Sequence, residues 1–348
     1  MKYNRGNKSL FWCQILVLFV LLFTSCSREE QPVHYSSLVM GTFCDLTFIT
    51  APGTNPDNIA NAVFNRIRYL ESLWSFYRPG SEISRLNREG RIKSSPATRA
   101  LLKNAREISR ISDGAFDITV APLMSAWKEA EKAGEPPDLK PLLSLVGYQK
   151  LKIEEDGTVY FLKKGMAIDL GGIGKGAAVD EAVSLLKSYG VKSGIVNLGG
   201  NLYAFGAGPH QGKWKVGIQN PRGEGVIGAV LIKDRGVSTS GNYQRYFEIG
   251  KRQYSHILNP KTGSLEGNYP EGVTVIAPTA LLADGLSTAL TVLGSEKGIT
   301  LAEETPGVEA LIIMSGPVFY TTKGFPTINS PHPDPLRGCP APPLRGEG

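Results

Sequence analysis

Apolar side chains recur in four stretches of the chain at the spacing of one face of an α-helix. The predicted helices cover residues 59–74, 96–108, 179–186 and 282–293. The second begins at Ser95-Pro96, a capping residue followed by a proline at the first helical position. Gly190 follows the third, and glycine commonly ends helices.

Short apolar runs between these helices predict strands. They cover residues 39–50, 195–198, 215–218, 228–232, 274–277 and 310–314. Helices dominate the first half of the chain and strands the second, whereas a parallel βαβ fold would alternate them regularly. The pattern therefore predicts an α+β fold with mixed, largely antiparallel sheets and packed helices.

The first 25 residues differ from the rest of the chain. Their basic residues are Lys2, Arg5 and Lys8. An apolar run over residues 10–23 follows, which is short for a membrane span, and small residues then stand directly before Cys26. This pattern resembles a bacterial lipoprotein signal in which Cys26 is lipidated, although Phe23 replaces the usual Leu. A plain secretory signal and an uncleaved anchor are the alternatives, and both also export the domain.

The composition excludes three classes of protein: a chain disordered throughout, a nucleic-acid-binding protein and a disulfide scaffold. The chain has 348 residues, 41% of them hydrophobic, which excludes disorder throughout. Removing residues 1–25 lowers the formal net charge from +6 to +3, too small an excess for a nucleic-acid-binding surface. Four cysteines are too few for a disulfide scaffold.

The predicted domain organisation has four parts. A signal peptide spans residues 1–25, and a linker spans 26–35 after the lipidated cysteine. One folded domain spans 36–328. A tail over 329–348, rich in Pro and Gly, is expected to be disordered.

A glycine-rich turn over residues 167–176 is the first candidate for chemistry. An apolar strand ends there, and the third helix begins. Glycines let backbone N–H groups approach phosphate oxygens, and Lys175 adds a positive charge. Close packing of the helix is the alternative reason for such glycines. The turn matches neither the Walker pattern nor the dinucleotide fingerprint.

Asp284, Thr288 and His256 are further candidates. Asp284 and Thr288 stand four residues apart, on one face of the predicted last helix. Their oxygens suit Mg²⁺, although a carboxylate near a helix start is also favoured by the helix dipole alone. His256 is a lone histidine near a turn, and such residues are usually structural. No zinc-ligand spacing and no nucleophile elbow accompany it.

Taken in chain order, these segments resemble the ApbE family, the FAD:protein FMN transferases. The resemblance covers about residues 36–328 and rests on Val39-Met-Gly-Thr42, residues 75–87, 114–119, 169–176 and 196–200, Ser240-Gly241, Ser255-His-Ile257, Pro260-Lys-Thr-Gly263, and Ala283-Asp284 with Thr288. The chain departs from the family's usual pattern at Gly172, where Ala is common, and at Asn242 and Asn259, where Asp is common. The implied fold is ApbE-like and similar to a T-fold.

The resemblance implies transfer of FMN from FAD, with Mg²⁺, to a threonine hydroxyl of an exported or membrane redox protein, with release of AMP. The implied FAD contacts are Met40, Tyr77, Ala115, Phe116, Asp117, Asp169, Lys175 and Leu258. The implied magnesium ligands are the carbonyl of Gly172 and the side chains of Asp284 and Thr288. Lys175 would neutralise pyrophosphate charge, and His256 is the candidate general base.

Two other functions stay open at this point. An FAD pyrophosphatase would use water as the acceptor and give FMN and AMP. A flavin-binding lipoprotein without turnover would not need Asp284, Thr288, Lys175 and His256 together. The resemblance points to acceptors among subunits of sodium-pumping NADH:quinone oxidoreductase or Rnf-type complexes. We expect a lipid-anchored protein of the bacterial cell envelope that faces the periplasm, in either the inner or the outer membrane.

Overall fold

The computed structural model describes residues 32–329, except 52, 242–245, 250, 251, 256, 266 and 268. These residues belong to a compact unit that begins at Pro32. The predictions for the signal peptide, Cys26, Asn242, His256 and residues 330–348 lie outside the described residues, so they stay predictions.

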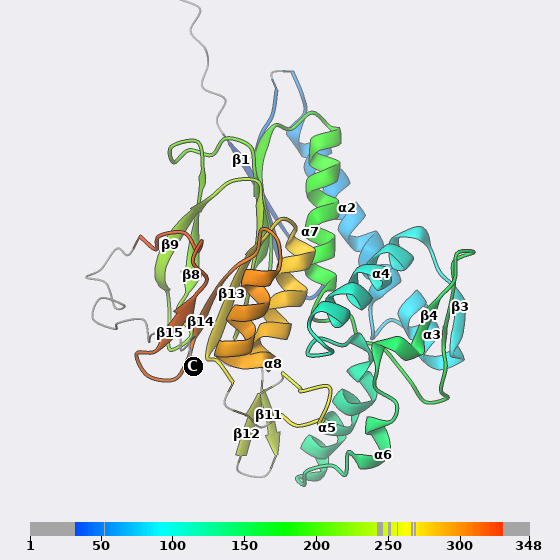
Figure 1. Cartoon of the computed structure of the whole chain (residues 1–348). Coiled ribbons are helices and arrows are strands. Elements are labelled where there is room, and N and C mark those ends of the chain that lie inside the picture. Colours follow the sequence, from blue (N-terminus) through cyan, green and yellow to red (C-terminus); the bar gives the residue numbers. More distant parts are fainter. Residues whose placement is uncertain are drawn as a thin grey trace, which may run out of the picture. The chain divides into compact units, whose positions relative to one another are not determined.

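An antiparallel eight-stranded sheet forms the centre of this unit (Figure 1). Its strand order is β1-β2-β6-β7-β10-β13-β14-β15, and every neighbouring pair is antiparallel. The strands are β1 (Val33–Val39), β2 (Thr42–Ile49), β6 (Ser193–Leu198), β7 (Asn201–Phe205), β10 (Arg235–Gly241), β13 (Gly272–Ala277), β14 (Glu309–Ile313) and β15 (Phe319–Thr321).

The two faces of the sheet have different covers. Helices α2 (Pro56–Trp74), α7 (Gly174–Ser188) and α8 (Ala280–Glu304) pack on one face. A hairpin of β8 (Trp214–Gln219) and β9 (Val226–Ile232) packs on the other (Figure 1). Alternation along β13 shows the division, because Val275 belongs to the helix-side core and Ile276 to the hairpin-side core. The sheet is therefore buried on both sides at β13, whereas β1 and β2 at its edge keep exposed positions such as Leu38 and Phe43.

Short elements between α2 and α7 form a lateral layer that carries several of the candidate site residues. It consists of α3 (Glu82–Glu89), β3 (Arg91–Lys93), α4 (Pro96–Ile111), η1 (Ile118–Val120), α5 (Ala121–Ala133), α6 (Lys140–Leu143), η2 (Tyr148–Lys150), β4 (Leu151–Ile153) and β5 (Thr158–Phe161). The hairpin of β11 (Tyr246–Ile249) and β12 (Arg252–Ser255) packs against α5, where Phe247 and Tyr254 join the same apolar cluster as Trp127.

The predicted strand over residues 39–50 begins too early. The structure places a two-residue turn at Met40 and Gly41, with φ of 50° and 73°, and Val39 pairs with Thr42 across it. Such hairpin turns require positive φ at both central residues, and the non-glycine Met40 concealed the turn in the sequence. Strand β1 begins at Val33 and so includes residues assigned to the predicted linker.

The last helix is longer than its apolar pattern predicted. Helix α8 extends to Glu304 and is interrupted at Gly294, whose φ of 76° is not helical. Glycine adopts this conformation without strain, so the chain can change direction there. Within residues 32–329, apart from the undescribed positions, no helix has both the length and the apolar character needed to cross a membrane.

Candidate active site at the α7 and α8 N-termini

The N-termini of α7 and α8 meet at Gly176. A Cβ atom at this position would lie 2.4 Å from the Ala280 carbonyl oxygen and 2.7 Å from the Asp284 Cβ. Only glycine permits such an approach. The packing interpretation of the glycine-rich turn therefore holds for Gly176, and this packing also brings Asp284 to the start of α7.

The Asp284 carboxylate is buried, with 5% of the residue exposed. Its Oδ2 accepts a hydrogen bond from the Gly176 N–H at 2.8 Å. Burial raises its pKa to about 6, while Lys175 and the Gly176 amide act in the opposite direction. No hydrogen bond to Oδ1 is found among the described residues, which leaves one carboxylate oxygen for a ligand.

Gly172 lies beside Thr288 and Phe116. A Cβ atom on Gly172 would lie 3.2 Å from the Thr288 Oγ1 and 3.3 Å from the Phe116 Cε2. Thr288 follows Asp284 by one helical turn, and its hydroxyl donates to the Asp284 carbonyl at a long 3.5 Å. The structure therefore places Gly172 next to Thr288, which lies one helical turn after Asp284.

These oxygen donors fit Mg²⁺ better than a softer metal. Within the described part of the chain, no group of three or more His, Cys, Asp or Glu side chains is placed to hold a metal. A single carboxylate with a hydroxyl and a carbonyl is a sparse set of hard ligands. Mg²⁺ suits such a set because it typically completes its coordination with water and substrate phosphates.

The Asp117 carboxylate accepts hydrogen bonds from two other residues of the chain. Its Oδ1 accepts from the Thr119 N–H at 2.8 Å and the Thr119 hydroxyl at 2.7 Å, and its Oδ2 accepts from the Tyr148 N–H at 2.8 Å. Burial raises the pKa of Asp117, whereas these bonds lower it. The carboxylate thus joins η1 to η2 and fixes the turn that carries Phe116.

Asp169 begins the glycine-rich turn and is anchored through its backbone. Its N–H donates to the Ile118 carbonyl at 2.8 Å, and its Oδ1 accepts from the Gly171 N–H at 2.7 Å. Asn87 holds the preceding residue, Ile168, through both its N–H and its carbonyl oxygen. Asn87 lies within the resembling segment 75–87, but nothing in the sequence identified this contact.

Met40 and Tyr77 lie on a more exposed part of the structure. The Met40 N–H donates to Glu71 at 3.2 Å, and Glu71 pairs with Arg78 at 3.2 Å. Tyr77 is 76% exposed, and its hydroxyl accepts from Lys128 Nζ at 3.0 Å. The sequence did not identify Lys128, which lies on α5, far from Tyr77 along the chain.

The other implied flavin contacts are buried or half-buried. Ala115 and Phe116 are buried in the turn after α4, and Lys175 is half-buried at the start of α7. Leu258 packs in the apolar cluster with Leu123 and Trp127 of α5.

Residues 257–263 are tied to α5 as well, because the Trp127 indole N–H donates to the Gly263 carbonyl at 2.8 Å. Asn259 stands at a position where Asp is common in the family. Its Oδ1 accepts a hydrogen bond from the Lys261 N–H at 2.9 Å. A carboxylate would accept the same bond. The change from Asp to Asn therefore preserves this turn.

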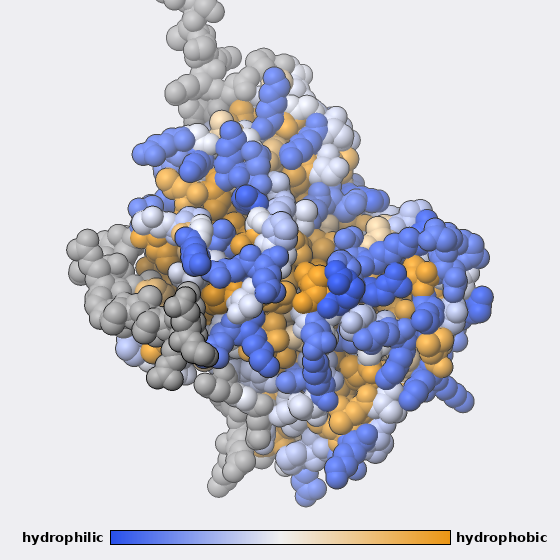
Figure 2. Space-filling model, in the orientation of Figure 1, coloured by the Kyte–Doolittle hydropathy of each residue, from blue (hydrophilic) through white to orange (hydrophobic). Residues whose placement is uncertain are grey.

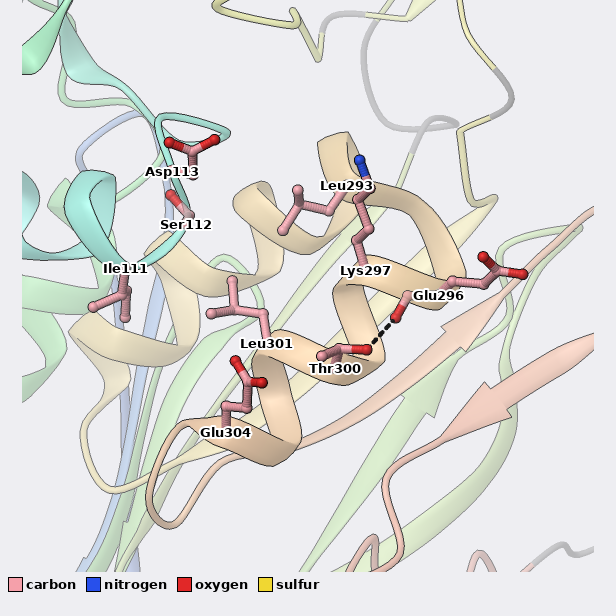
Figure 3. Close-up of a pocket in the computed structure, with 9 residues that line it drawn as sticks. All are labelled: Ile111, Ser112, Asp113, Leu293, Glu296, Lys297, Thr300, Leu301 and Glu304. Carbon is pink, nitrogen blue, oxygen red and sulfur yellow. Dashed lines mark hydrogen bonds between the residues drawn. The ribbon is translucent and has the colours of Figure 1, made fainter. Parts of the chain in front are cut away.

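A cavity of about 380 Å³ lies between the end of α4 and the second half of α8 (Figure 3). It is lined by Ile111, Ser112, Asp113, Leu293, Glu296, Lys297, Thr300, Leu301 and Glu304. None of these is a predicted site residue.

Hydrophilic residues cover much of the face in Figure 2, with apolar patches between them.

An antiparallel sheet with helices on one face and a hairpin on the other, and with a glycine-rich turn packed on a buried carboxylate, defines a mixed α/β protein. The chain belongs to the ApbE family, whose model matches residues 40–312. The FAD:protein FMN transferase of Treponema pallidum is 31% identical over 333 residues, which cover 88% of this chain and 92% of the relative. That of Vibrio cholerae is 31% identical over 319 residues, covering 88% and 95%.

Solved structures agree with this relationship. The flavin transferase ApbE from Vibrio cholerae matches with a TM-score of 0.74 and 27% identity, covering 84% of this chain and 97% of that one. The apo form of the Pseudomonas stutzeri flavinyl transferase ApbE matches with a TM-score of 0.75 and 32% identity, covering 84% and 95%. The predicted family, fold class and transferase class are confirmed.

Proposed function

We propose that this chain is an FAD:protein FMN transferase that modifies a threonine hydroxyl of an exported redox protein. The relatives' names support the transfer of FMN from FAD to a protein. The observation that carries the proposal for this chain is the convergence of Gly172, Asp284 and Thr288 beside Lys175. A protein that only stored flavin would not need this group.

In the proposed reaction the threonine oxygen attacks the phosphorus of the FMN half of FAD. A bond forms between this oxygen and the phosphorus, and the bond to the bridging oxygen breaks. AMP leaves with that oxygen, and the threonine proton passes to a base. The products are a phosphoester-linked FMN on the acceptor and free AMP.

Asp284, Thr288 and the Gly172 carbonyl are the residues we propose to hold Mg²⁺. The bound ion would neutralise charge on the pyrophosphate and stabilise the leaving group. Lys175 stands at the first turn of α7, where its ammonium group and the helix N-terminus both favour an anion. The chain thus offers positive potential on the α7 side and hard oxygen ligands on the α8 side.

His256 remains the proposed general base on the sequence alone, because it lies outside the described residues. A neutral imidazole accepts a proton near physiological pH. We propose that Met40, Tyr77, Ala115, Phe116, Asp117, Asp169 and Leu258 form or support the flavin site. Asp117 and Leu258 would act mainly through the turns that they stabilise, since both are buried within the chain.

We further propose that Cys26 carries a lipid anchor and that the domain faces the periplasm. The acceptors would be subunits of Nqr- or Rnf-type complexes or other exported flavoproteins. Mass spectrometry of the mature N-terminus tests the anchor. An acylated Cys26 is the expected result, and a free N-terminus at any other residue would refute it.

One experiment separates the proposed activity from its alternatives. The protein is incubated with FAD and Mg²⁺, with and without an acceptor domain that carries the threonine, and AMP is measured. AMP that depends on the acceptor is the expected result. AMP without an acceptor would indicate a pyrophosphatase, and no AMP in either sample would indicate a flavin-binding protein.

A further inference from the structure

Helices α7 and α8 exchange carboxylate contacts at their N-termini. Asp284 of α8 accepts from the Gly176 N–H in the first turn of α7 at 2.8 Å. Asp180 of α7 accepts from the Ala280 N–H at 2.8 Å and the Leu281 N–H at 2.9 Å, both in the first turn of α8. Each helix therefore satisfies amides at the start of the other.

The contact from Asp180 completes the capping of α8. The first amides of a helix lack partners within the helix. In α8 the N-cap Thr279 side chain accepts from the Leu282 N–H at 3.1 Å, and Asp180 takes the two amides before it. In α7 the N-cap residue Ile173 makes no side-chain cap, so Asp284 supplies one instead.

Close packing fixes the same turn of α8 from two sides. A Cβ atom on Gly176 of α7 would lie 2.4 Å from the Ala280 carbonyl oxygen. On the β10 side, a Cβ atom on Gly236 would lie 2.4 Å from the Ala280 nitrogen. The turn that precedes Asp284 is therefore held between two glycines, with Asp180 bonded to its amides.

We propose that Asp180 is a positioning residue for the metal site, because it fixes the first turn of α8 so that the oxygens of Asp284 and Thr288 face Gly172. Each Asp180 oxygen accepts a hydrogen bond from a backbone amide of α8, so the contacts of this carboxylate serve the helix start. The inference rests on the proposed function, since it assumes that Asp284 and Thr288 bind Mg²⁺.

The decisive variant is Asp180→Asn. It preserves the size of the side chain but turns a –NH₂ group toward one of the two N–H groups, so one bond is lost. The matched control is Glu82→Gln. Glu82 of α3 likewise accepts from the Ser95 N–H at the start of another helix, α4, at 3.0 Å and 3.1 Å.

The measurement is a calorimetric Mg²⁺ titration of the full-length protein saturated with FAD, without acceptor, together with its thermal midpoint. We expect Asp180→Asn to weaken Mg²⁺ binding by about 10- to 100-fold, the range typical of residues that orient metal ligands. Glu82→Gln should lower the thermal midpoint and leave Mg²⁺ affinity unchanged. Equal Mg²⁺ affinity in Asp180→Asn and wild type would overturn the positioning role of Asp180 but leave the proposed function standing.

Gly236→Ala provides a second route to the same turn of α8, in case Asp180→Asn does not fold. Its added methyl group must displace the Ala280 backbone, so we expect Mg²⁺ binding to weaken here as well. Unchanged affinity in this variant would also count against the positioning role. Wild-type protein that neither binds Mg²⁺ nor releases AMP would instead refute the proposed function.

Discussion

The two sides of the candidate site are built differently. At the junction of α7 and α8, Asp284 is 5% exposed and is held by a backbone amide of the neighbouring helix. On the other side, Tyr77 is 76% exposed and meets Lys128 through one hydrogen bond and a ring contact at 5.0 Å. Tertiary packing fixes Asp284, whereas Tyr77 is largely exposed.

This difference predicts how each side responds to substitution. Removing Asp284, the proposed metal ligand, should affect the chemistry, because its free carboxylate oxygen is the proposed contact to the ion. Removing the exposed ring of Tyr77, a proposed flavin contact, should lower the contact area with the flavin and leave the proposed reacting groups in place. We therefore expect losses in turnover on the α7 and α8 side and losses in FAD affinity on the Tyr77 side.

The largest effect is expected for Asp284. Asp284→Ala should lower transfer by about 10⁴-fold, equivalent to about 5.5 kcal/mol of transition-state stabilisation. Asp284→Asn is the structural control, because its amide oxygen can still accept from Gly176 while the negative charge is lost. Both variants should show the loss in steady-state AMP release. Near-normal turnover of either one at saturating Mg²⁺ would disprove the ligand assignment.

His256→Asn should lower turnover by about 10²–10⁴-fold and leave FAD affinity nearly unchanged, because proton removal matters only on the way to the transition state. Wild-type activity should fall as the pH drops through the imidazole titration, since only the neutral ring accepts a proton. This acidic limb should be absent from the variant. A strong loss of affinity with the limb retained would mean that the imidazole binds phosphate instead.

Asp180 should make the stability of the protein depend on pH. Burial raises its pKa from 3.8 to about 6, and the nearby Asp284 acts in the same direction. The folded state therefore binds this proton more tightly than the unfolded state, and the stability that it provides is lost as the pH rises from about 4 to about 6. In Mg²⁺-free buffer the free energy of unfolding should fall by about 1–3 kcal/mol over this pH range, and the thermal midpoint should fall with it. The slope should be smaller in Asp180→Asn, and equal slopes would contradict the assignment.

Tyr77→Ala should have the smallest effect, a rise in the KM for FAD of about 2- to 12-fold with kcat nearly unchanged. Tyr77→Phe should lose less, because it retains the ring and gives up only the bond to Lys128. Tyr189→Ala, at an exposed tyrosine beyond the end of α7, is the matched control and should match wild type. A fall in kcat for Tyr77→Ala would remove the distinction between the two sides.

Local sequence patterns predicted the elements that have strong periodicity. Helices α2 and α4 have the expected apolar faces, and Ser95 caps α4 through the Thr98 N–H. The glycine-rich turn and the Asp284 and Thr288 pair were also visible, because their spacing is local. Short strands such as β3, with three residues, carry too little pattern to be recognised.

Contacts between distant residues could not be predicted from spacing. Asp180 bonds to residues about 100 positions later, and no local pattern identifies such a partner. The same holds for Lys128 beside Tyr77, 51 positions apart. The sequence allowed both a packing and a ligand-binding role for the glycine-rich turn, and the approach of α8 shows the packing role of Gly176. Local spacing thus nominates candidate residues, whereas the contacts that hold them depend on the fold.

We propose that the α7 and α8 junction directs FMN from FAD onto a protein hydroxyl. The most direct measurement is flavin fluorescence on the acceptor after a denaturing gel, with FAD and Mg²⁺ present. Wild-type protein should label the acceptor, and Asp284→Asn protein should not, while an acceptor with its threonine replaced by valine should stay unlabelled with either. Labelling by Asp284→Asn at the wild-type rate, or no labelling by wild type while AMP is released, would refute this role of the α7 and α8 junction.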